Sequence, residues 1–395
     1  MRTKTECRKY IIEQAKKYFS QKREIYVIGQ KQEDIDYIYR LLVNSSLRGK
    51  FIKGSAQKFL SDLGIAQIML LQDEISGILY ADRKSVSAFE KNLRLEKYKN
   101  LCFEVPYDFF CLAEAEATER IIECFAPMTS NGRINDIQFD ITDKCNLNCA
   151  LCSHFSPLVK VENRYSIEQF TKDAWRLREL TEHVECVDLW GGEALLHPDL
   201  DKMIEISREV FPESRVAVGT NGILIPTISD DFLDTVKRNA CMIRISGYPP
   251  TIKMLDKIEK RLVEKEIKYT IAPVDKFFKR YELPGENNAS ARHAGCTSKI
   301  CHVVKNGTYS SCYVPYGAKV FNEYFGDKFS VNASVFDLYD EELDMISFTE
   351  KVKGELDICR FCGDIELHSW KTVGKEKDDI SSWVNIRRQE TESDE

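Results

Sequence analysis

The sequence predicts an α/β protein in which parallel strands alternate with helices. The main observation is an alternation of short apolar runs with longer helix-patterned stretches between residues 131 and 285. The same alternation recurs on a smaller scale in residues 1–130. Repeated strand–helix units of this length place the strands in parallel with the helices outside them, as an open sheet or a barrel.

The central region is expected to contain five strands, at Ile137–Ile141, Glu185–Leu189, Arg215–Val218, Met242–Ile245 and Tyr269–Ala272. Four helices are expected between them, at Ile167–Thr181, Leu200–Val210, Asp230–Arg238 and Ile252–Lys265. Thr251 is placed to cap the last helix, because its hydroxyl oxygen can accept from a free backbone N–H. The motifs that carry chemistry follow these strands directly, and α/β barrels hold their active sites at those strand ends.

Residues 1–130 are expected to form a small Rossmann-like α/β domain for recognition or docking. The expected elements are a helix at Glu6–Phe19, a strand at Glu24–Gly29, a helix at Glu33–Leu42 and a second apolar run at Ala66–Leu71. Gln-Lys-Gln follows Gly29, so the glycine-rich loop that binds a dinucleotide phosphate is missing. No nucleotide is assigned to this domain.

Composition and charge limit the classes of function. The chain has 395 residues, enough for about two or three domains. Its net charge of −7 and pI near 5.6 disfavour nucleic acid as a partner, because duplex binding needs a basic face. We find neither an apolar run that could span a membrane nor, at the charged N-terminus, a secretory signal. Fourteen cysteines in such a chain indicate a reducing, cytoplasmic setting, where clustered cysteines bind metal.

The most informative motif is a group of three cysteines just after the strand-like run IQFDIT. Cys145, Cys149 and Cys152 have the spacing C-x3-C-x2-C. Three thiolates on one short loop can hold three corners of a [4Fe–4S] cluster, which normally takes four cysteines, and leave its last iron open. A zinc half-site is the alternative, but no closely spaced fourth ligand follows Cys152.

The motif Trp190-Gly191-Gly192-Glu193 stands at the end of the next expected strand. Together with the cysteine spacing it resembles the radical S-adenosylmethionine (SAM) superfamily. The resemblance implies a partial (β/α)6 barrel and a cluster whose open iron binds SAM. It also implies reductive cleavage of SAM to methionine and a 5′-deoxyadenosyl radical, which abstracts hydrogen from a substrate.

The resemblance also implies where SAM is bound. The backbone of Gly191 and Gly192 would receive the SAM ammonium, because a side chain there would block close approach of the ligand. Glu193 would supply negative charge or hold the loop. Thr220 and Asn221 follow the third strand of the expected sheet, and Ser246 ends the fourth, where it is the choice for a ribose or carboxylate contact.

Two residues beside the last of these loops are candidate catalytic residues. Arg244 and Tyr248 flank it and are placed either to touch the substrate or to pack. His154, beside the first cysteine loop, is a candidate to line the active site. The residue before the third cysteine, usually aromatic in this family, is Leu151.

A second group of cysteines lies in residues 286–372. The order C-x10-G-x4-C followed by C-x2-C resembles the auxiliary-cluster extension called twitch, a short form of the SPASM extension, built as a β-hairpin plus a helix. A hairpin is expected at Asn306-Gly307. The resemblance implies a closed auxiliary [4Fe–4S] cluster that transfers electrons, and structural zinc is the alternative. Its expected ligands are Cys296, Cys312, Cys359 and Cys362.

Cys301 remains outside this set because its spacing to Gly307 is too short. It is either a strand thiol packed as a small hydrophobe, or a hydrogen-atom donor or substitute ligand. The expected domains are therefore residues 1–130, a radical SAM core at 131–285, a twitch domain at 286–372, and a polar, partly disordered tail at 373–395.

The expected function is a radical SAM enzyme acting on a polar, hydroxylated, sugar-like small molecule by dehydrogenation or epimerisation. The auxiliary cluster would accept an electron from the substrate radical, and flavodoxin or ferredoxin would be the electron donor by family analogy. One alternative is a maturase of ribosomal peptides, since many cluster-extended members modify peptides. Another is a non-catalytic metal-binding scaffold, which would have no reason to bind SAM.

Overall fold

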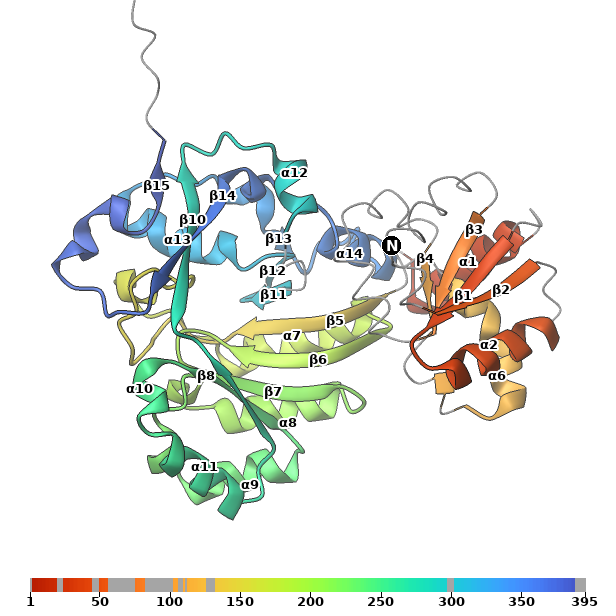
Figure 1. Ribbon diagram of the computed structural model, residues 1–395, viewed down its shortest axis with the longest axis horizontal. Coiled ribbons are helices and arrows are strands. Elements are labelled where there is room, and N and C mark those ends of the chain that lie inside the picture. Colours follow the sequence, from red (N-terminus) through yellow and green to blue (C-terminus); the bar gives the residue numbers. More distant parts are fainter. Residues whose placement is uncertain are drawn as a thin grey trace, which may run out of the picture. The chain divides into compact units, whose positions relative to one another are not determined.

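The computed structural model describes residues 2–19, 24–44, 50–55, 75–81, 102–105, 109–110, 112–125, 132–296 and 302–387. The chain divides into two compact units. The first is Met1–Arg133 together with Asp344–Glu350, and the second is Ile134–Leu343 together with Lys351–Glu395. Figure 1 labels the elements of both.

The first unit is a small α/β domain on a parallel sheet, as the sequence predicts. Its strands lie in the order β2 (Lys50–Ser55), β1 (Glu24–Gly29), β3 (Ile75–Tyr80) and β4 (Cys102–Glu104). Its helical elements are α1 (Lys4–Phe19), α2 (Gln32–Asn44), α6 (Glu114–Arg120) and the 3₁₀ helix η3 (Ile121–Phe125).

Helix α2 belongs to the core of this unit because its apolar residues recur at helical spacing. Ile35, Ile38 and Leu42 are buried in one cluster with Val27 of β1 and Leu79 of β3. The predicted strand and helix at the start of this domain are thereby confirmed. The further strand expected at Ala66–Leu71 lies outside the described residues.

The second unit is built on an eight-stranded sheet with the order β13-β12-β11-β5-β6-β7-β8-β9. Strands β6 to β9 pair in parallel, and β11 pairs in parallel with β5. All five strands expected in the central region are present. The bounds are β5 (Arg133–Asp140), β6 (His183–Trp190), β7 (Arg215–Thr220), β8 (Met242–Gly247), β9 (Tyr269–Pro273), β11 (His302–Lys305), β12 (Thr308–Ser310) and β13 (Phe336–Asp337).

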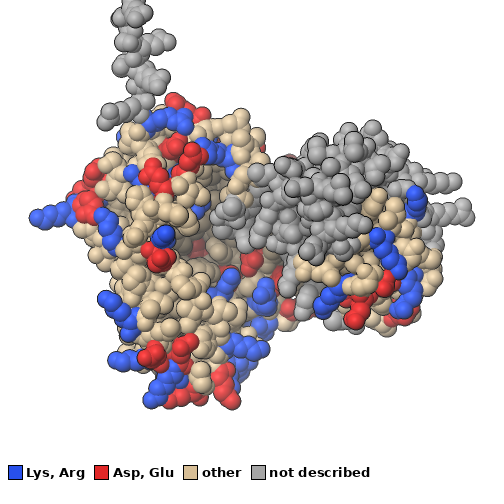
Figure 2. Space-filling view, in the orientation of Figure 1, with Lys and Arg blue, Asp and Glu red and all other residues tan. Residues whose placement is uncertain are grey.

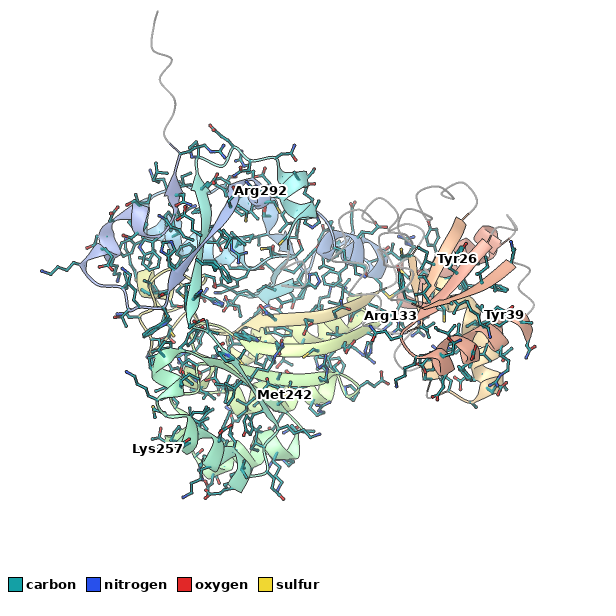
Figure 3. All side chains as sticks on the ribbon, in the orientation of Figure 1. Tyr26, Tyr39, Arg133, Met242, Lys257 and Arg292 are labelled. Carbon is teal, nitrogen blue, oxygen red and sulfur yellow. The ribbon has the colours of Figure 1, made fainter. Side chains whose placement is uncertain are left out.

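The helices between these strands cover one face of the sheet. Phe139 of β5 packs on Phe170 of α7 with ring centroids 4.8 Å apart. Figure 3 shows side chains between the layers, with Met242 at the start of β8 and Lys257 on α11 labelled. The helices are α7 (Ile167–Leu180), α8 (Leu200–Val210), α9 (Asp230–Arg238), α10 (Pro249–Ile252) and α11 (Leu255–Glu264).

The prediction that Thr251 caps a helix is wrong. Thr251 lies inside α10, and α11 begins after Met254. The Thr251 hydroxyl donates instead to the backbone carbonyl of Asn221, at 2.6 Å, and the side chain is fully buried. Pro249 fits the first turn of α10 because that position needs no backbone N–H, so the helix starts earlier than the hydroxyl pattern indicates.

The predicted hairpin at Asn306-Gly307 is confirmed, and it extends the main sheet. Asn306 and Gly307 both have positive φ, 45° and 79°, which is the backbone that an Asn-Gly hairpin turn requires. Strands β11 and β12 pair in antiparallel fashion across it. Because β11 also pairs with β5, the hairpin is joined to the edge of the parallel sheet.

A two-stranded ribbon runs across the second unit in Figure 1. Strand β10 (Lys276–Leu283) pairs in antiparallel fashion with β14 (Cys362–Ser369), and the short β15 (Asn385–Ile386) adds to β10. The other elements of the second unit are η4 (Ser156–Leu158), η5 (Ala194–Leu196), η6 (Ile225–Thr227), α12 (Ala289–Ala294), α13 (Val314–Phe325), η7 (Asn332–Ser334), η8 (Asp357–Phe361), η9 (Lys375–Asp378) and η10 (Ile380–Ser382). Helix α14 (Met345–Val352) belongs to the first unit up to Glu350.

The segment predicted as a polar tail folds back onto the second unit over residues 373–387. Trp383 is only 2% exposed and packs against Phe155, with ring centroids 5.8 Å apart. Trp383 and Val384 belong to one apolar cluster with Leu283. Val373 and Ile380 pack against the same cluster, so a few apolar residues in a mainly polar stretch anchor it.

No helix among the described residues is long and apolar enough to cross a membrane. On the visible face of the second unit, basic and acidic side chains are intermingled (Figure 2).

Candidate functional site

The three cysteines of the first motif lie together. Cys145, Cys149 and Cys152 line one pocket at the end of β5. All three come from the loop that follows the strand, which is where a parallel sheet collects its functional groups. Cys149 is only 6% exposed, so the loop turns its sulfur inward.

Gly191 and Gly192 pack against this loop, which is a role that the sequence analysis did not include. A Cβ at Gly191 would lie 2.3 Å from the Thr142 carbonyl oxygen, and one at Gly192 would lie 2.4 Å from that of Lys144. The Gly192 N–H donates to the Thr142 oxygen at 2.7 Å. In this structure the glycines let the backbone after β6 lie against the start of the cysteine loop. A side chain at either position would therefore clash with the protein backbone even when no ligand is bound.

Gly192→Ala is therefore expected to push the cysteine loop out of place. An overpacked site of this kind costs about 1–3 kcal/mol, so we expect a lower Tm and a loss of iron from the first cysteine group. Iron content after anaerobic reconstitution and thermal unfolding measure both effects. Gly374→Ala is the control, because its Cβ would meet only the carboxylate of Glu376, the end of a flexible side chain. Full iron and an unchanged Tm in Gly192→Ala would contradict this account of the loop.

Glu193 ties the loop after β6 to the loop after β7. Its carboxylate accepts from the Thr220 hydroxyl at 2.6 Å, the Leu195 N–H at 3.0 Å and the Asn221 N–H at 2.8 Å. Glu193 is 1% exposed, and burial raises its pKa. Of the two roles considered from the sequence, this geometry is that of a loop-holding group.

Asn221 connects the same network to the cysteine loop. Its side-chain amide donates to the Asn146 side-chain oxygen at 2.6 Å, and its backbone oxygen accepts from Thr251. Sequence reasoning missed Asn146 and Thr251. The position of Asn146 inside the cysteine motif, directly after Cys145, was the only available signal.

Aromatic side chains complete the walls of the pocket. Tyr248, after β8, lies against Phe277 of β10 with ring centroids 5.7 Å apart. Trp190 covers Gly219, where a Cβ would lie 2.3 Å from the indole ring. Phe277 was not predicted and Trp190 was named only as part of its motif, because nothing in their local sequence shows which loops their rings contact.

Most of the predicted SAM-contact residues meet the three cysteines at this pocket. Glu193 is not among the residues that line the pocket, and neither is Arg244, which was predicted as a catalytic residue. The residues predicted from the sequence that line the pocket are Cys145, Cys149, Cys152, His154, Gly191, Gly192, Thr220, Asn221, Ser246 and Tyr248.

The electrostatics of the pocket disfavour three bare thiolates. Burial raises the pKa of Cys145 to about 12 and that of Cys149 to about 11, and it also raises the pKa of Cys152. Negative charge on one thiol raises the pKa of its neighbours further. A metal reverses this balance, because a coordinated thiol loses its proton outright.

The residues fit a SAM-bound iron–sulfur cluster. Soft thiolate donors suit iron–sulfur clusters, and the pocket offers three. Trp190 and His154 line the same pocket. The Nε1 of Trp190 and the Nδ1 of His154 are buried and have no hydrogen-bond partner among the described residues. Burial lowers the pKa of His154 to about 4, so its imidazole is neutral and available for polar contacts at neutral pH.

A group of charged side chains lies on the sheet face opposite the helices. Phe139 faces α7, so by strand alternation Asp136 and Asp140 of β5 face the other way. Arg244 of β8 is hydrogen-bonded to Asp188 of β6 and lies 3.9 Å from Asp136. The Arg244 side chain remains 39% exposed while Asp188 is buried.

Cys186 completes this charged group, because its sulfur lies 3.7 Å from an Asp188 oxygen. Asp136, Cys186 and Asp188 could together approach a metal ion, but the guanidinium of Arg244 already supplies their positive charge. The signal in the sequence that could have revealed this group is the presence of polar residues at alternate positions of otherwise apolar strands. Which of them pair follows only from the register of the sheet.

Lys305 makes a second ion pair on this face of the sheet. Its ammonium lies 2.6 Å from an Asp140 oxygen and also contacts Asp143. The Lys305 side chain is 9% exposed, and the two carboxylates keep its pKa raised despite burial. Because Lys305 ends β11, this pair fastens the hairpin to β5.

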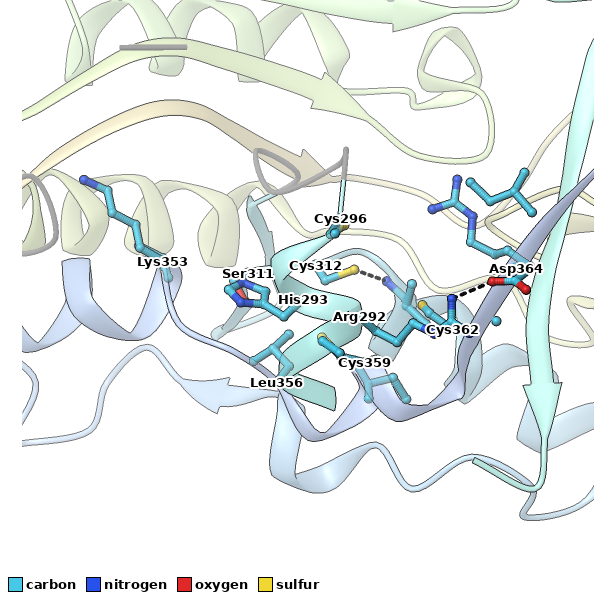
Figure 4. Close-up of a pocket in the computed structure, with 18 residues that line it drawn as sticks. Arg292, His293, Cys296, Ser311, Cys312, Lys353, Leu356, Cys359, Cys362 and Asp364 are labelled. Carbon is cyan, nitrogen blue, oxygen red and sulfur yellow. Dashed lines mark hydrogen bonds and ion pairs between the residues drawn. The ribbon is translucent and has the colours of Figure 1, made fainter. Parts of the chain in front are cut away.

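The second cysteine group is also brought together. Cys296, Cys312, Cys359 and Cys362 line one pocket of about 370 Å³, drawn in Figure 4. They come from four places in the chain: after α12, after β12, within η8 and at the start of β14. Cys301, the fifth cysteine of this region, lies outside the described residues.

The second pocket favours metal in the same way as the first. Burial raises the pKa of Cys362 to about 11 and also raises that of Cys359. Charge on Cys296 raises both pKa values further. Arg292, which pairs with Asp364 at 2.8 Å, and Arg280 line the same pocket and place positive charge beside the thiols.

Comparison with known families agrees with the first cysteine site. Residues 139–279 match the radical SAM superfamily. This range contains the three-cysteine loop and the loops after β6, β7 and β8.

Curated relatives share only part of their length with this chain. A GTP 3′,8-cyclase of Sulfurovum sp. is 32% identical over 110 residues, which is 26% of this chain and 32% of the relative. The antilisterial bacteriocin subtilosin biosynthesis protein AlbA of Bacillus subtilis is 34% identical over 100 residues, 25% of this chain and 21% of the relative. The chain thus spans about a third or less of these two relatives.

Similar solved structures include BtrN in complex with AdoMet and 2-DOIA, at 16% identity, 58% of this chain, 93% of that chain and a TM-score of 0.37. Streptococcus suis SuiB bound to the precursor peptide SuiA is another. It has 12% identity, covers 82% of this chain and 85% of that chain, and has a TM-score of 0.35.

Proposed function

We propose, on the premise that residues 139–279 form a radical SAM domain, that the protein is a radical SAM enzyme for a polar, hydroxylated small molecule. The reaction would oxidise or epimerise a hydroxyl-bearing carbon. The observation that carries the substrate class is the charged group of Asp136, Asp188 and Arg244 on the open face of the sheet.

The first pocket would bind the cofactors. Cys145, Cys149 and Cys152 would hold a [4Fe–4S] cluster, which when bound supplies the electron that cleaves SAM. The residues of the chain define the shape of the pocket and exclude water from it. Glu193 fixes the loops after β6 and β7, and Tyr248 and Phe277 exclude water from one side.

The charged group would bind the substrate's hydroxyl or amino groups. The guanidinium of Arg244 on β8 is partly accessible, while its partner Asp188 on β6 is buried. An accessible cation beside the accessible carboxylate of Asp136, 24% exposed, offers both donors and acceptors to a polyol. An extended apolar substrate would leave these groups unpaired, at a cost in free energy.

The second pocket would hold an auxiliary [4Fe–4S] cluster on Cys296, Cys312, Cys359 and Cys362. Four thiols in one pocket close the coordination, so its role would be to accept an electron from the substrate rather than to bind SAM. The proton lost in an oxidation would pass to a carboxylate of the charged group, of which Asp136 is the more accessible member.

A substrate panel tests the proposed function. Reconstituted enzyme, SAM and dithionite are mixed with free amino sugars, cyclitols, nucleotide-linked sugars or short peptides. We expect the sugar-like compounds to raise 5′-deoxyadenosine formation above the uncoupled rate and to give up deuterium from a labelled carbinol carbon to it. Stimulation by peptides alone would overturn the substrate class and favour a peptide maturase.

Arg244→Met is expected to weaken turnover of a substrate found in this way. The variant keeps much of the side-chain volume and removes the cation, so we expect kcat/KM to fall about tenfold or more, or ~1.4 kcal/mol. Uncoupled SAM cleavage should persist, because Arg244 does not line the first pocket. Arg215→Met, an exposed strand arginine paired with Glu185, is the matched control. Equal kcat/KM in both variants, at similar Tm, would contradict a substrate role for Arg244.

A further inference from the structure

The indole of Trp370 is hydrogen-bonded to a sulfur of the first cysteine group. Its Nε1–H donates to Cys149 Sγ at 3.1 Å, across 221 positions of sequence. Cys145, by contrast, accepts from the backbone N–H of nearby Leu147, at 3.4 Å. The contact to Cys149 comes from a side chain, so a single substitution can remove it.

The backbone around Trp370 holds the indole in place. The Trp370 N–H donates to the Asp275 oxygen at 2.7 Å, just before β10. The next residues form a small ladder with the cysteine loop. The Ala150 N–H donates to the backbone carbonyl oxygen of Lys371 at 2.9 Å. The Val373 N–H donates to the backbone carbonyl oxygen of Asn148 at 2.8 Å. Backbone hydrogen bonds at the residues on both sides of Cys149, one donated by Ala150 and one accepted by Asn148, thus hold the indole near the sulfur.

We propose that Trp370 is a positioning residue that sets the reduction potential of the cluster on Cys145, Cys149 and Cys152 by donating its indole N–H to the Cys149 sulfur. The inference rests on the proposed function, since it needs a cluster at this site. Hydrogen bonds to cluster sulfurs are one of the means by which a protein sets the potential.

The direction of the effect follows from charge. Reduction adds one electron, and part of that negative charge falls on the sulfur ligands. A donor to a charged acceptor makes a stronger hydrogen bond than one to a less charged acceptor. The indole N–H therefore stabilises the reduced cluster more than the oxidised one and makes the potential less negative. Removing the donor should make the cluster harder to reduce.

The same strand connects this donor to the second cysteine pocket. Strand β14 begins at Cys362, and Trp370 follows its last residue. Strand β14 thus carries Cys362 of the second site at its start and leads directly into Trp370 at the first site. A test must therefore keep β14 intact and change only the indole.

The test is a potentiometric titration of the full, anaerobically reconstituted chain, followed by electron paramagnetic resonance. Wild type is compared with Trp370→Phe, which keeps an aromatic ring and loses the donor. Trp175→Phe on α7, at an indole 47% exposed, is the matched control. Repeating the titration in a Cys359→Ala background assigns the signal to the first cluster.

We expect Trp370→Phe to retain the iron of the first site and to show a midpoint potential more negative than that of the wild type. Trp175→Phe should keep the wild-type value. A fully loaded Trp370→Phe with the wild-type midpoint would overturn the inference and leave the proposed function intact. A wild type whose iron does not depend on Cys145 would instead overturn the proposed function.

If Trp370→Phe fails to retain iron, Trp370→His takes its place, because histidine keeps a ring N–H. A midpoint closer to the wild type in Trp370→His than in a loaded Trp370→Ala supports the donor role. Equal midpoints in these two variants would contradict it.

Discussion

Cys145→Ala is expected to reduce 5′-deoxyadenosine formation from SAM to background. The pocket offers three sulfur ligands, all on one loop, and losing one leaves two. A cluster with one open iron needs three protein ligands, so the site should lose its cluster and with it the electron that cleaves SAM. Iron content and a dithionite-driven cleavage assay, analysed by chromatography, measure the two losses together.

Cys241→Ala is the matched control for this variant. Cys241 is a buried thiol, 2% exposed, just before β8, and it lines neither cysteine pocket. It should keep iron and cleavage at the wild-type level. SAM cleavage retained by a fully iron-loaded Cys145→Ala protein would contradict the assignment of the first site.

Cys359→Ala is expected to remove one cluster and to leave the other working. Iron should fall from about eight to about four per chain, one cube of four, while uncoupled SAM cleavage continues. Oxidation of the substrate should stop, because the electron left on the substrate radical would lose its acceptor. Iron analysis, the cleavage assay and product analysis on a substrate from the panel separate these effects.

The control for the second site is again Cys241→Ala, which should keep about eight irons. Unchanged iron in Cys359→Ala would reject the second cluster. Zinc in place of iron at this pocket would make the site structural, as a tetrahedron of four thiolates allows.

The sequence predicts the parallel sheet and the order of its loops because both are local. Strands such as Arg215–Thr220 and Met242–Gly247 are short apolar runs between amphipathic helices, and they form where the pattern indicates. The Asn306-Gly307 turn is local in the same sense, since two positive φ angles suit these two residues.

Two contacts between distant segments could not be predicted. Trp370 reaches Cys149 only because β14 runs beside β10 to the cysteine loop. The pairing of Arg244 with Asp188 depends on the register across β6, β7 and β8.

The glycines of the second motif were identified as important for an incomplete reason. Their spacing shows that a close approach occurs, but it does not show what approaches. In the structure the neighbour is the backbone of residues 142–144.

The most direct test of the account is the iron and sulfide content of anaerobically reconstituted protein, followed by a dithionite assay for 5′-deoxyadenosine from SAM. The account predicts about eight irons per chain, two cubes of four, with 5′-deoxyadenosine formed. About four irons per chain, one cube, together with SAM cleavage would support the enzyme assignment and reject the auxiliary cluster. Zinc alone with SAM untouched would contradict the account and leave a metal-binding scaffold.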